Sequence, residues 1–191
     1  MTKIKITKLA YVFFAFGIGA LLYILVHETG HLIVMLSAGA TIDDFSILTA
    51  HVSAHGGNYT DGSEMWMNAN GAVFPIVCSM AAMLFYKRSN QGAFYRIFYF
   101  FITFVPIGST LAWVIIPILY AKGKAPAGDD VTKFLEIWTK YHSPYLVSAA
   151  AVLVIVAGVY IAAAVGIFHG YMEEVRSLKT DGQEQDKGEQ P

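Results

Sequence analysis

The stretch LAYVFFAFGIGALLYILVHETGHLIVML, residues 9–36, decides the fold of this chain. Its first part, from Leu9 to Val26, has no charged residue, and the apolar pattern resumes at Leu32. An apolar run of about 20 residues is long enough to cross a bilayer as a helix. Ionisable groups at that depth cost about 2 to 3 kcal/mol or more each unless they are partnered, and they usually serve a function. The sequence therefore predicts a membrane-spanning helix that carries a functional site.

The polar interruption of this run is His27-Glu28-Thr29-Gly30-His31, which has the form HExxH. Residues four apart lie on one face of a helix, so both imidazoles point the same way, and Glu28 lies one residue round from the first. This is the arrangement of two zinc ligands beside a general base. The structural alternative is a set of buried polar residues that tie helices together, or a helix end that emerges into water.

Composition places the chain among membrane proteins. Of its 191 residues, 55% are hydrophobic and 14% are charged, and the mean hydropathy is +0.51, which is too apolar for an ordinary soluble domain of this length. The formal net charge of -1 leaves no extended basic face for a nucleic acid. Cys78 is the single cysteine, so an intramolecular disulfide and a thiolate cluster are excluded. Any metal must be held by His and carboxylate.

The predicted fold is an α-helical integral membrane protein with about four transmembrane helices. The expected spans lie near residues 9–38, 66–86, 94–121 and 144–169. Pro106, Gly108 and Pro117 should kink the third span or split it into two shorter helices. The N-terminal lysines followed by an apolar run imitate a secretion signal. Because the run continues through the HExxH motif, an uncleaved first helix is the preferred interpretation.

Two segments outside the spans have distinct patterns. Residues 40–64 are polar with a short apolar alternation, and they predict a small β-hairpin after the first helix, in which Gly56-Gly57 turns the chain. Asp129 and Asp130 predict the cap and the first turn of an amphipathic helix that runs to about Tyr141.

The tail from Glu173 onward is charged and poor in apolar residues, which predicts disorder. The sequence is therefore divided into a membrane-embedded domain, residues 1–172, and a disordered charged cytoplasmic tail, residues 173–191.

Basic residues predict the orientation, because cytoplasmic segments carry an excess of Lys and Arg. With the N-terminus in the cytoplasm, the cytoplasmic segments hold most of these residues: Lys3, Lys5, Lys8, Lys87, Arg88, Arg96, Arg176, Lys179 and Lys187. The chain is therefore expected to be a multi-pass protein of the plasma or inner membrane. This topology brings four polar residues toward the non-cytoplasmic side, where they can meet: His27, His31, Asn70 and Asp130.

A catalytic zinc ion needs three protein ligands and an open position, and the HExxH motif supplies two ligands. The candidates for the third are acids and histidines: Asp129, Asp130, His51, His55, Asp61, Glu64, His142, Glu173 and Glu174. Glu173 and Glu174 rank last because the predicted topology puts them in the cytoplasm. His51 and His55 lie in a region that favours strand and loop, where histidines are more typical of an exposed surface or of substrate contact.

Three features together resemble the site-2 protease family of intramembrane zinc metalloproteases, and most of all its small, minimal members. They are the HExxH motif in a first core membrane helix, the hairpin with Gly56-Gly57, and Asn70-Gly71 at the opening of the next span. The resemblance covers roughly residues 15–135. It implies one zinc ion bound by His27, His31 and a distal aspartate, with Glu28 as the group that activates water.

The chain departs from the family pattern in two places. Asn70-Gly71-Ala72 stands where the family often has Ala-Gly-Pro, and no Asp-Gly pair occurs within a later span. Gly128-Asp129-Asp130 resembles a variant of the ligand motif found among small members, in which the aspartate opens a helix. Asp130 is preferred over Asp129 as the ligand because Asp129 suits the capping position. The alternative is two ordinary acids at a helix N-terminus.

The resemblance implies a metalloprotease-like domain that uses a single Zn2+ to hydrolyse peptide bonds of membrane-spanning or juxtamembrane substrates. The expected partners are a membrane protein or peptide and the lipid bilayer. Asn70, or Asn68, and His55 are the candidate substrate-binding residues. Two other functions are compatible with the residues: a non-catalytic membrane chaperone or regulator that binds helices, and a small metal or proton transporter.

Overall fold

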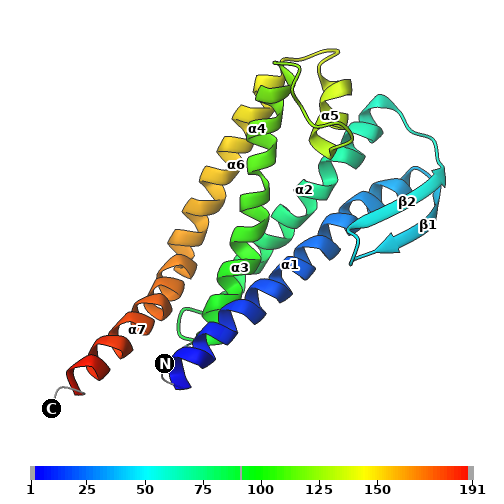
Figure 1. Cartoon of the computed structure of the whole chain (residues 1–191). Helices are drawn as coiled ribbons and strands as arrows, with labels where there is room; N and C mark the ends of the chain where they lie inside the picture. Colours follow the sequence, from blue (N-terminus) through cyan, green and yellow to red (C-terminus); the bar gives the residue numbers. More distant parts are fainter. Residues whose placement is uncertain (1–2, 91, 189–191) are drawn as a thin grey trace.

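The computed structural model describes residues 3–90 and 92–188, which form a bundle of helices with a two-stranded hairpin at its side (Figure 1). In chain order the elements are α1 (Lys3–Ser37), β1 (Ala40–Ser46), β2 (His51–Gly56), α2 (Asp61–Leu84), α3 (Ala93–Ser109), α4 (Leu111–Tyr120), α5 (Asp130–Trp138), α6 (Pro144–Val165) and α7 (Ile167–Gly188). The two strands pair with each other in antiparallel orientation.

Four helical stretches within the described residues are long and apolar enough to cross a membrane. They are Ile6–Ser37 in α1, Asp61–Leu84 as α2, Ala93–Tyr120 across α3 and α4, and Pro144–Val165 as α6. Much of their apolar surface is accessible, since Phe13 and Leu153 are 69% and 70% exposed. Apolar surface of this kind suits contact with lipid better than contact with water. The predicted number of long apolar helices is confirmed, and the second begins at Asp61 rather than near residue 66.

The third apolar stretch is split at Thr110, as its prolines predict. The Thr110 amide bonds to the Ile107 carbonyl at 3.2 Å, which interrupts the α-helical pattern. The Pro106 carbonyl instead accepts the hydroxyl groups of Ser109 at 2.7 Å and of Thr110 at 3.2 Å. Side-chain hydroxyls thus satisfy a backbone group that an apolar environment would otherwise leave unpaired.

The hairpin differs from the prediction in the position of its turn. The chain reverses at residues 47–50, where the Ala50 amide bonds to the Ile47 carbonyl at 3.3 Å. The predicted turn at Gly56-Gly57 is therefore wrong. Gly56 ends β2, where it pairs with Ala40, and Gly57 follows it. Their φ angles of +72° and +85° are left-handed values that glycine adopts without strain. They redirect the chain from the hairpin toward α2.

Helix α5 begins as predicted. The Asp129 carboxylate accepts the Val131 amide at 2.9 Å and caps the helix, which leaves Asp130 as its first residue. Val131 and Leu135 are buried in an apolar cluster that also contains residues of α4 and α6. This cluster fixes α5 against the bundle, and the helix ends at Trp138, somewhat earlier than expected.

Helix α7 covers residues 173–188 of the predicted tail. The guanidinium of Arg96 on α3 is buried, and its Nη1 lies 2.5 Å from Glu173 and 3.4 Å from Glu174. The ring of Tyr171 stacks on Phe100 with centroids 3.8 Å apart. The expected domain boundary at residue 173 therefore falls inside a helix whose first turns are attached to the bundle by ion pairs and a stacked ring.

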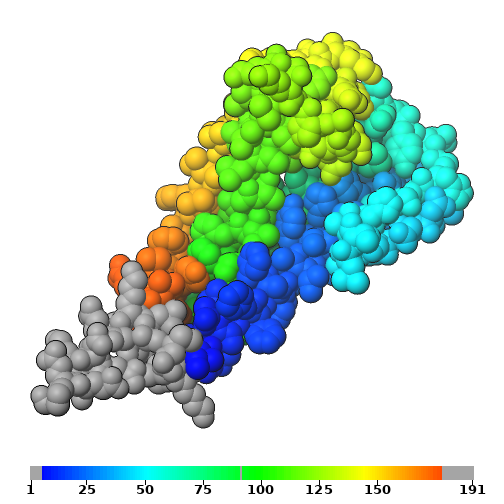
Figure 2. All heavy atoms as spheres, in the orientation of Figure 1, coloured from blue at the N-terminus to red at the C-terminus, as the bar shows by residue number. Residues whose placement is uncertain are grey.

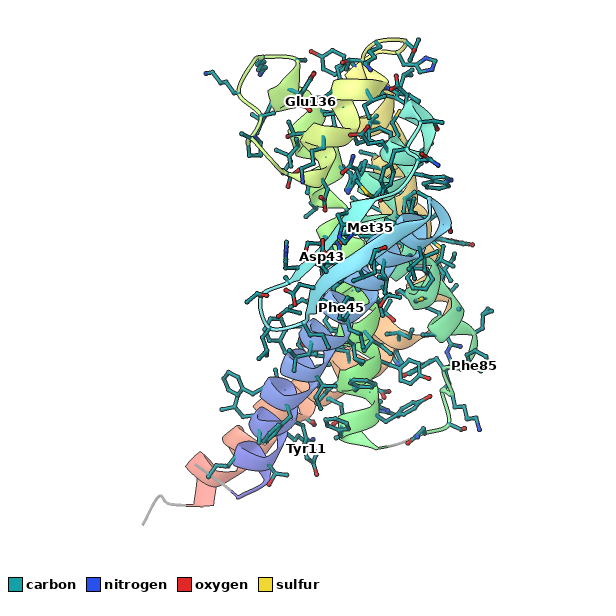
Figure 3. The ribbon with its side chains drawn as sticks, turned by 90° about the vertical axis from the view of Figure 1, so that its right-hand side faces the viewer. Tyr11, Met35, Asp43, Phe45, Phe85 and Glu136 are labelled. Atoms are coloured by element: carbon teal, nitrogen blue, oxygen red, sulfur yellow. The ribbon has the colours of Figure 1, made fainter. Side chains whose placement is uncertain are left out.

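The long helices alternate in direction, so the described ends of α1 and α7 lie at one end of the bundle and α5 lies at the other (Figure 1). Figure 3 shows Glu136 of α5 and Tyr11 of α1 toward these opposite ends, with Asp43 of the hairpin between them. The C-terminal half of α1 therefore comes near α5, although the two are far apart in the sequence. This is the arrangement that the predicted site requires.

Replacing Arg96 by Met should destabilise the protein by roughly 2 to 3 kcal/mol. This loss is smaller than the roughly 3 to 5 kcal/mol typical of a broken buried ion pair, because one partner, Glu173, is half exposed. Thermal unfolding in detergent and limited proteolysis of α7 measure the effect. Lys87→Met is the control, since it removes an exposed cation from the same end of the bundle. An equal loss of stability in both variants would contradict a structural role for these ion pairs.

Candidate metal centre

Three side chains from α1 and α5 converge on one point. His27 and His31 lie one helical turn apart on α1, and their Nε2 atoms are 3.2 Å from each other. The Oδ2 atom of Asp130 lies 3.4 Å from the His27 Nε2 and 3.2 Å from the His31 Nε2. These are the residues that the sequence predicts as metal ligands, and together they form a group that can hold a metal ion.

The spacing of the three donor atoms fits a tetrahedral metal ion. Zinc–nitrogen bonds of about 2.0–2.1 Å at tetrahedral angles place neighbouring ligand atoms about 3.3–3.4 Å apart. The separations of 3.2, 3.2 and 3.4 Å in the structure lie close to that edge. Two imidazoles and a carboxylate also suit Zn2+ chemically. The residues present therefore fit zinc, and three protein ligands leave a fourth position for water or substrate.

Contacts on the far side of the rings orient the two imidazoles. The Nδ1 of His31 donates to the Met67 carbonyl on α2 at 2.7 Å, which turns its Nε2 toward His27 and Asp130. The Nδ1 of His27 lies 3.5 Å from the hydroxyl of Tyr23, one turn earlier on α1. Outer contacts of this kind fix the tautomer and the ring orientation of metal-binding histidines.

Two glycines let α1 and α2 cross in direct contact behind the histidines. A β-carbon at Gly71 would overlap the imidazoles of His27 and His31, and one at Gly30 would overlap the Asn70 carbonyl. The Nδ2 of Asn70 donates to the Gly30 carbonyl at 2.7 Å and links the two helices. The imidazole pair is therefore packed against the bare backbone of α2.

The predicted substrate-binding candidates separate into two groups. Asn68 is buried and lines the pocket beside His27, His31 and Asp130, and its Nδ2 donates to the Glu64 carbonyl at 2.9 Å. Asn70 and His55 lie outside that pocket. Asn70 uses its side-chain amide for the hydrogen bond to α1. His55 lies on β2 with its side chain 68% exposed, and its Nδ1 is 2.6 Å from the Asp43 Oδ1. Neither residue lines the pocket beside His27, His31 and Asp130. Their roles in substrate binding stay predictions.

Asp130 is held in its carboxylate form. Burial alone would raise its pKa, but hydrogen bonds to His27 and His31 and the charge of these rings outweigh burial and lower the pKa well below its usual value. An ionised carboxylate is the form that binds a metal. Among the described residues, no other candidate for the third ligand joins this group.

A pocket of about 280 Å³ opens beside the three ligands. Its walls include Glu28 and Met35 from α1, His51 and Val52 from the hairpin, Asn68 from α2 and Lys133 from α5. Figure 2 shows the hairpin and α5 on either side of this part of α1. Glu28 is 5% exposed, and no residue that the structure describes hydrogen bonds to its carboxylate. The carboxylate is therefore available to a molecule in the pocket.

Three features of the site have no role in the sequence-based prediction. Lys133 follows Asp130 by three residues and shares its helix face, so helical spacing would have placed it at the site. The contact of Gly71 with the imidazoles depends on how α1 and α2 cross, which the sequence does not show. The Met67 carbonyl leaves no signal, because almost every residue has the same backbone groups.

Comparison of the chain with models of protein families, with curated proteins and with solved structures finds no match. The geometry of the described residues is therefore the basis for a functional proposal.

Gly71→Ala should weaken zinc binding by about tenfold or more, the loss typical when contacts that orient metal ligands are disturbed. The added methyl group must displace the imidazoles of His27 and His31. Equilibrium dialysis of purified protein against buffered zinc measures the affinity. Gly17→Ala is the matched control, because a β-carbon at Gly17 on α1 meets nothing within 4 Å. Equal affinities in Gly71→Ala and the wild type would contradict the packing described above.

Proposed function

We propose that the protein is an intramembrane zinc metalloendopeptidase of the kind that the site-2 protease family represents. Zinc would be held by His27, His31 and Asp130, with Glu28 as the general base. The observation that carries the proposal is the match between the three donor-atom separations and tetrahedral zinc. Its second support is the buried Glu28 carboxylate in the adjoining pocket. Polar residues that merely tie helices together do not require a buried carboxylate without a hydrogen-bond partner beside them.

The side chains of the pocket suit hydrolysis of a peptide bond. When bound, zinc supplies a Lewis acid that polarises a carbonyl group and lowers the pKa of water to about 7. Glu28 accepts a proton from the water molecule whose oxygen adds to the peptide carbonyl carbon. As the C–N bond breaks, Glu28 returns that proton to the leaving amine. His31 keeps its Nδ1 proton throughout, because that proton is hydrogen bonded to Met67, away from the pocket.

The proposal places this reaction within the membrane. Four apolar helical stretches support insertion, and the distribution of Lys and Arg supports a cytoplasmic N-terminus in a plasma or inner membrane. The pocket would then lie toward the non-cytoplasmic side. The substrate would be a membrane protein or peptide. Its helix must unwind locally, because the hydrogen bonds of a helix engage the carbonyl groups that are to be attacked.

Glu28→Gln should retain zinc and lose peptide cleavage by at least about 100-fold, because the amide keeps the size of the side chain but cannot accept the proton. Zinc content and cleavage of a single-span model peptide in liposomes are measured on the same preparation. Glu136→Gln, which changes an exposed acid on α5, is the matched control and should cleave normally. Unchanged cleavage by Glu28→Gln would remove Glu28 from the mechanism and favour helix binding or metal transport.

Asp130→Asn should lose zinc, because the amide removes the one anionic donor from the group of two imidazoles and a carboxylate. Metal content after gel filtration measures the loss. Asp129→Asn is the matched control, since Asn caps a helix about as well as Asp, and the Asp129 carboxylate bonds to the Val131 amide. Zinc lost from Asp129→Asn and retained by Asp130→Asn would contradict the assignment.

A further inference from the structure

The pocket beside the metal ligands has two basic side chains that the proposed hydrolysis does not use. Lys133 comes from α5, and His51 comes from the start of β2. Apart from Glu28 and the metal ligands, the other walls are apolar or neutral, as Met35, Val52 and Asn68 illustrate. The part of the pocket that is left for a substrate therefore combines apolar and neutral polar walls with a basic edge.

The charge of Lys133 is not used within the fold. It follows Asp130 by three residues, so its side chain leaves α5 on the face that carries the metal ligand. Its ammonium group makes no ion pair or hydrogen bond with any residue that the structure describes. Two other lysines differ in this respect: Lys8 lies 3.3 Å from Glu174, and Lys140 lies 3.0 Å from Asp61.

The charges that face the pocket leave Lys133 as the cation for a substrate. Asp130 is occupied by the two imidazoles, and Glu28 must stay a free base in the proposed reaction. A bound zinc ion would balance the charges of these two acids. Lys133 forms no ion pair with either acid, so its positive charge can attract a substrate carboxylate that enters the pocket.

Building on the proposed peptidase, we infer that Lys133 is a specificity-determining residue that binds a carboxylate of the substrate near the scissile bond. The carboxylate belongs to an Asp or Glu side chain or to the C-terminus of a peptide. His51 adds a second basic group on the hairpin wall, and the apolar walls accept the residues beside the carboxylate. The preferred substrate is therefore an acidic juxtamembrane segment rather than a wholly apolar transmembrane segment.

The test uses the zinc-loaded full-length protein and single-span model peptides in liposomes. The peptides differ in the position of a single Glu in the juxtamembrane segment. Each is compared with the peptide that has Gln at that position, and every peptide is made with a free and with an amidated C-terminus. We expect kcat/KM to be about tenfold higher for the Glu peptide than for the Gln peptide at one or more positions of the Glu. The difference should lie mainly in KM, because a charge-assisted hydrogen bond strengthens binding by about this amount. If cleavage is faster with a free than with an amidated C-terminus and does not depend on the Glu, the bound carboxylate is that of the C-terminus.

Variants of Lys133 test whether this side chain binds the substrate carboxylate. Lys133→Met should abolish the preference for Glu over Gln while the zinc content is unchanged. Lys133→Glu should reverse the preference, so that a peptide with Lys at the same position is cleaved faster. Lys124→Met is the matched control, because Lys124 is exposed in the loop before α5 and does not line the pocket. Fluorescence anisotropy of the same peptides on Glu28→Gln, with and without Lys133→Met, measures binding independently of turnover.

The outcomes separate this inference from the proposed function. Equal cleavage of the Glu and Gln peptides at every position, with free and amidated C-termini alike, would overturn the role of Lys133. The proposed peptidase activity would be unaffected by that result. A carboxylate preference that survives in Lys133→Met would overturn it as well. Failure of the zinc-loaded wild type to cleave any of the peptides would overturn the proposed function, and this inference with it.

Discussion

The contact between the Asp130 carboxylate and the two imidazoles of α1 is the interaction on which the rest of the site depends. Polar groups within an apolar helix are costly unless they are partnered, and here the partner arrives from a separate helix. Asp129 caps that helix, and the burial of Leu135 among residues of α4 and α6 holds it in place. The apolar face of α5 thus positions its acidic first turn, so docking of α5 and formation of the ligand group are coupled.

The opposite side of the ligand group is set by the crossing of α1 and α2. Gly71 lets the backbone of α2 lie against both imidazoles, and the Met67 carbonyl fixes the His31 ring. The ligands are therefore held between two packed helices and the first turn of a third, rather than on flexible loops. A site supported in this way keeps its donor atoms in place before a metal binds, which reduces the reorganisation that binding requires.

Much of the fold follows from the sequence because it depends on local chemistry. The length of the apolar runs predicts the four long helices, the i and i+4 spacing predicts the paired imidazoles, and the capping preference of Asp129 points to Asp130 as the third member of the group. The parts that were missed depend on contacts distant in the sequence or on unusual backbone. The hairpin turns at Ala50, which has φ of +47° without being glycine, and α7 is attached through Arg96 of α3.

X-ray absorption spectroscopy at the zinc edge, on the purified, zinc-loaded protein, tests most directly whether two imidazoles and one carboxylate of this chain bind a single zinc ion. We expect a tightly bound ion with two imidazole nitrogens and a carboxylate oxygen at about 2.0–2.2 Å. Coordination by water oxygens without imidazole, or loss of the zinc on gel filtration, would contradict this set of ligands.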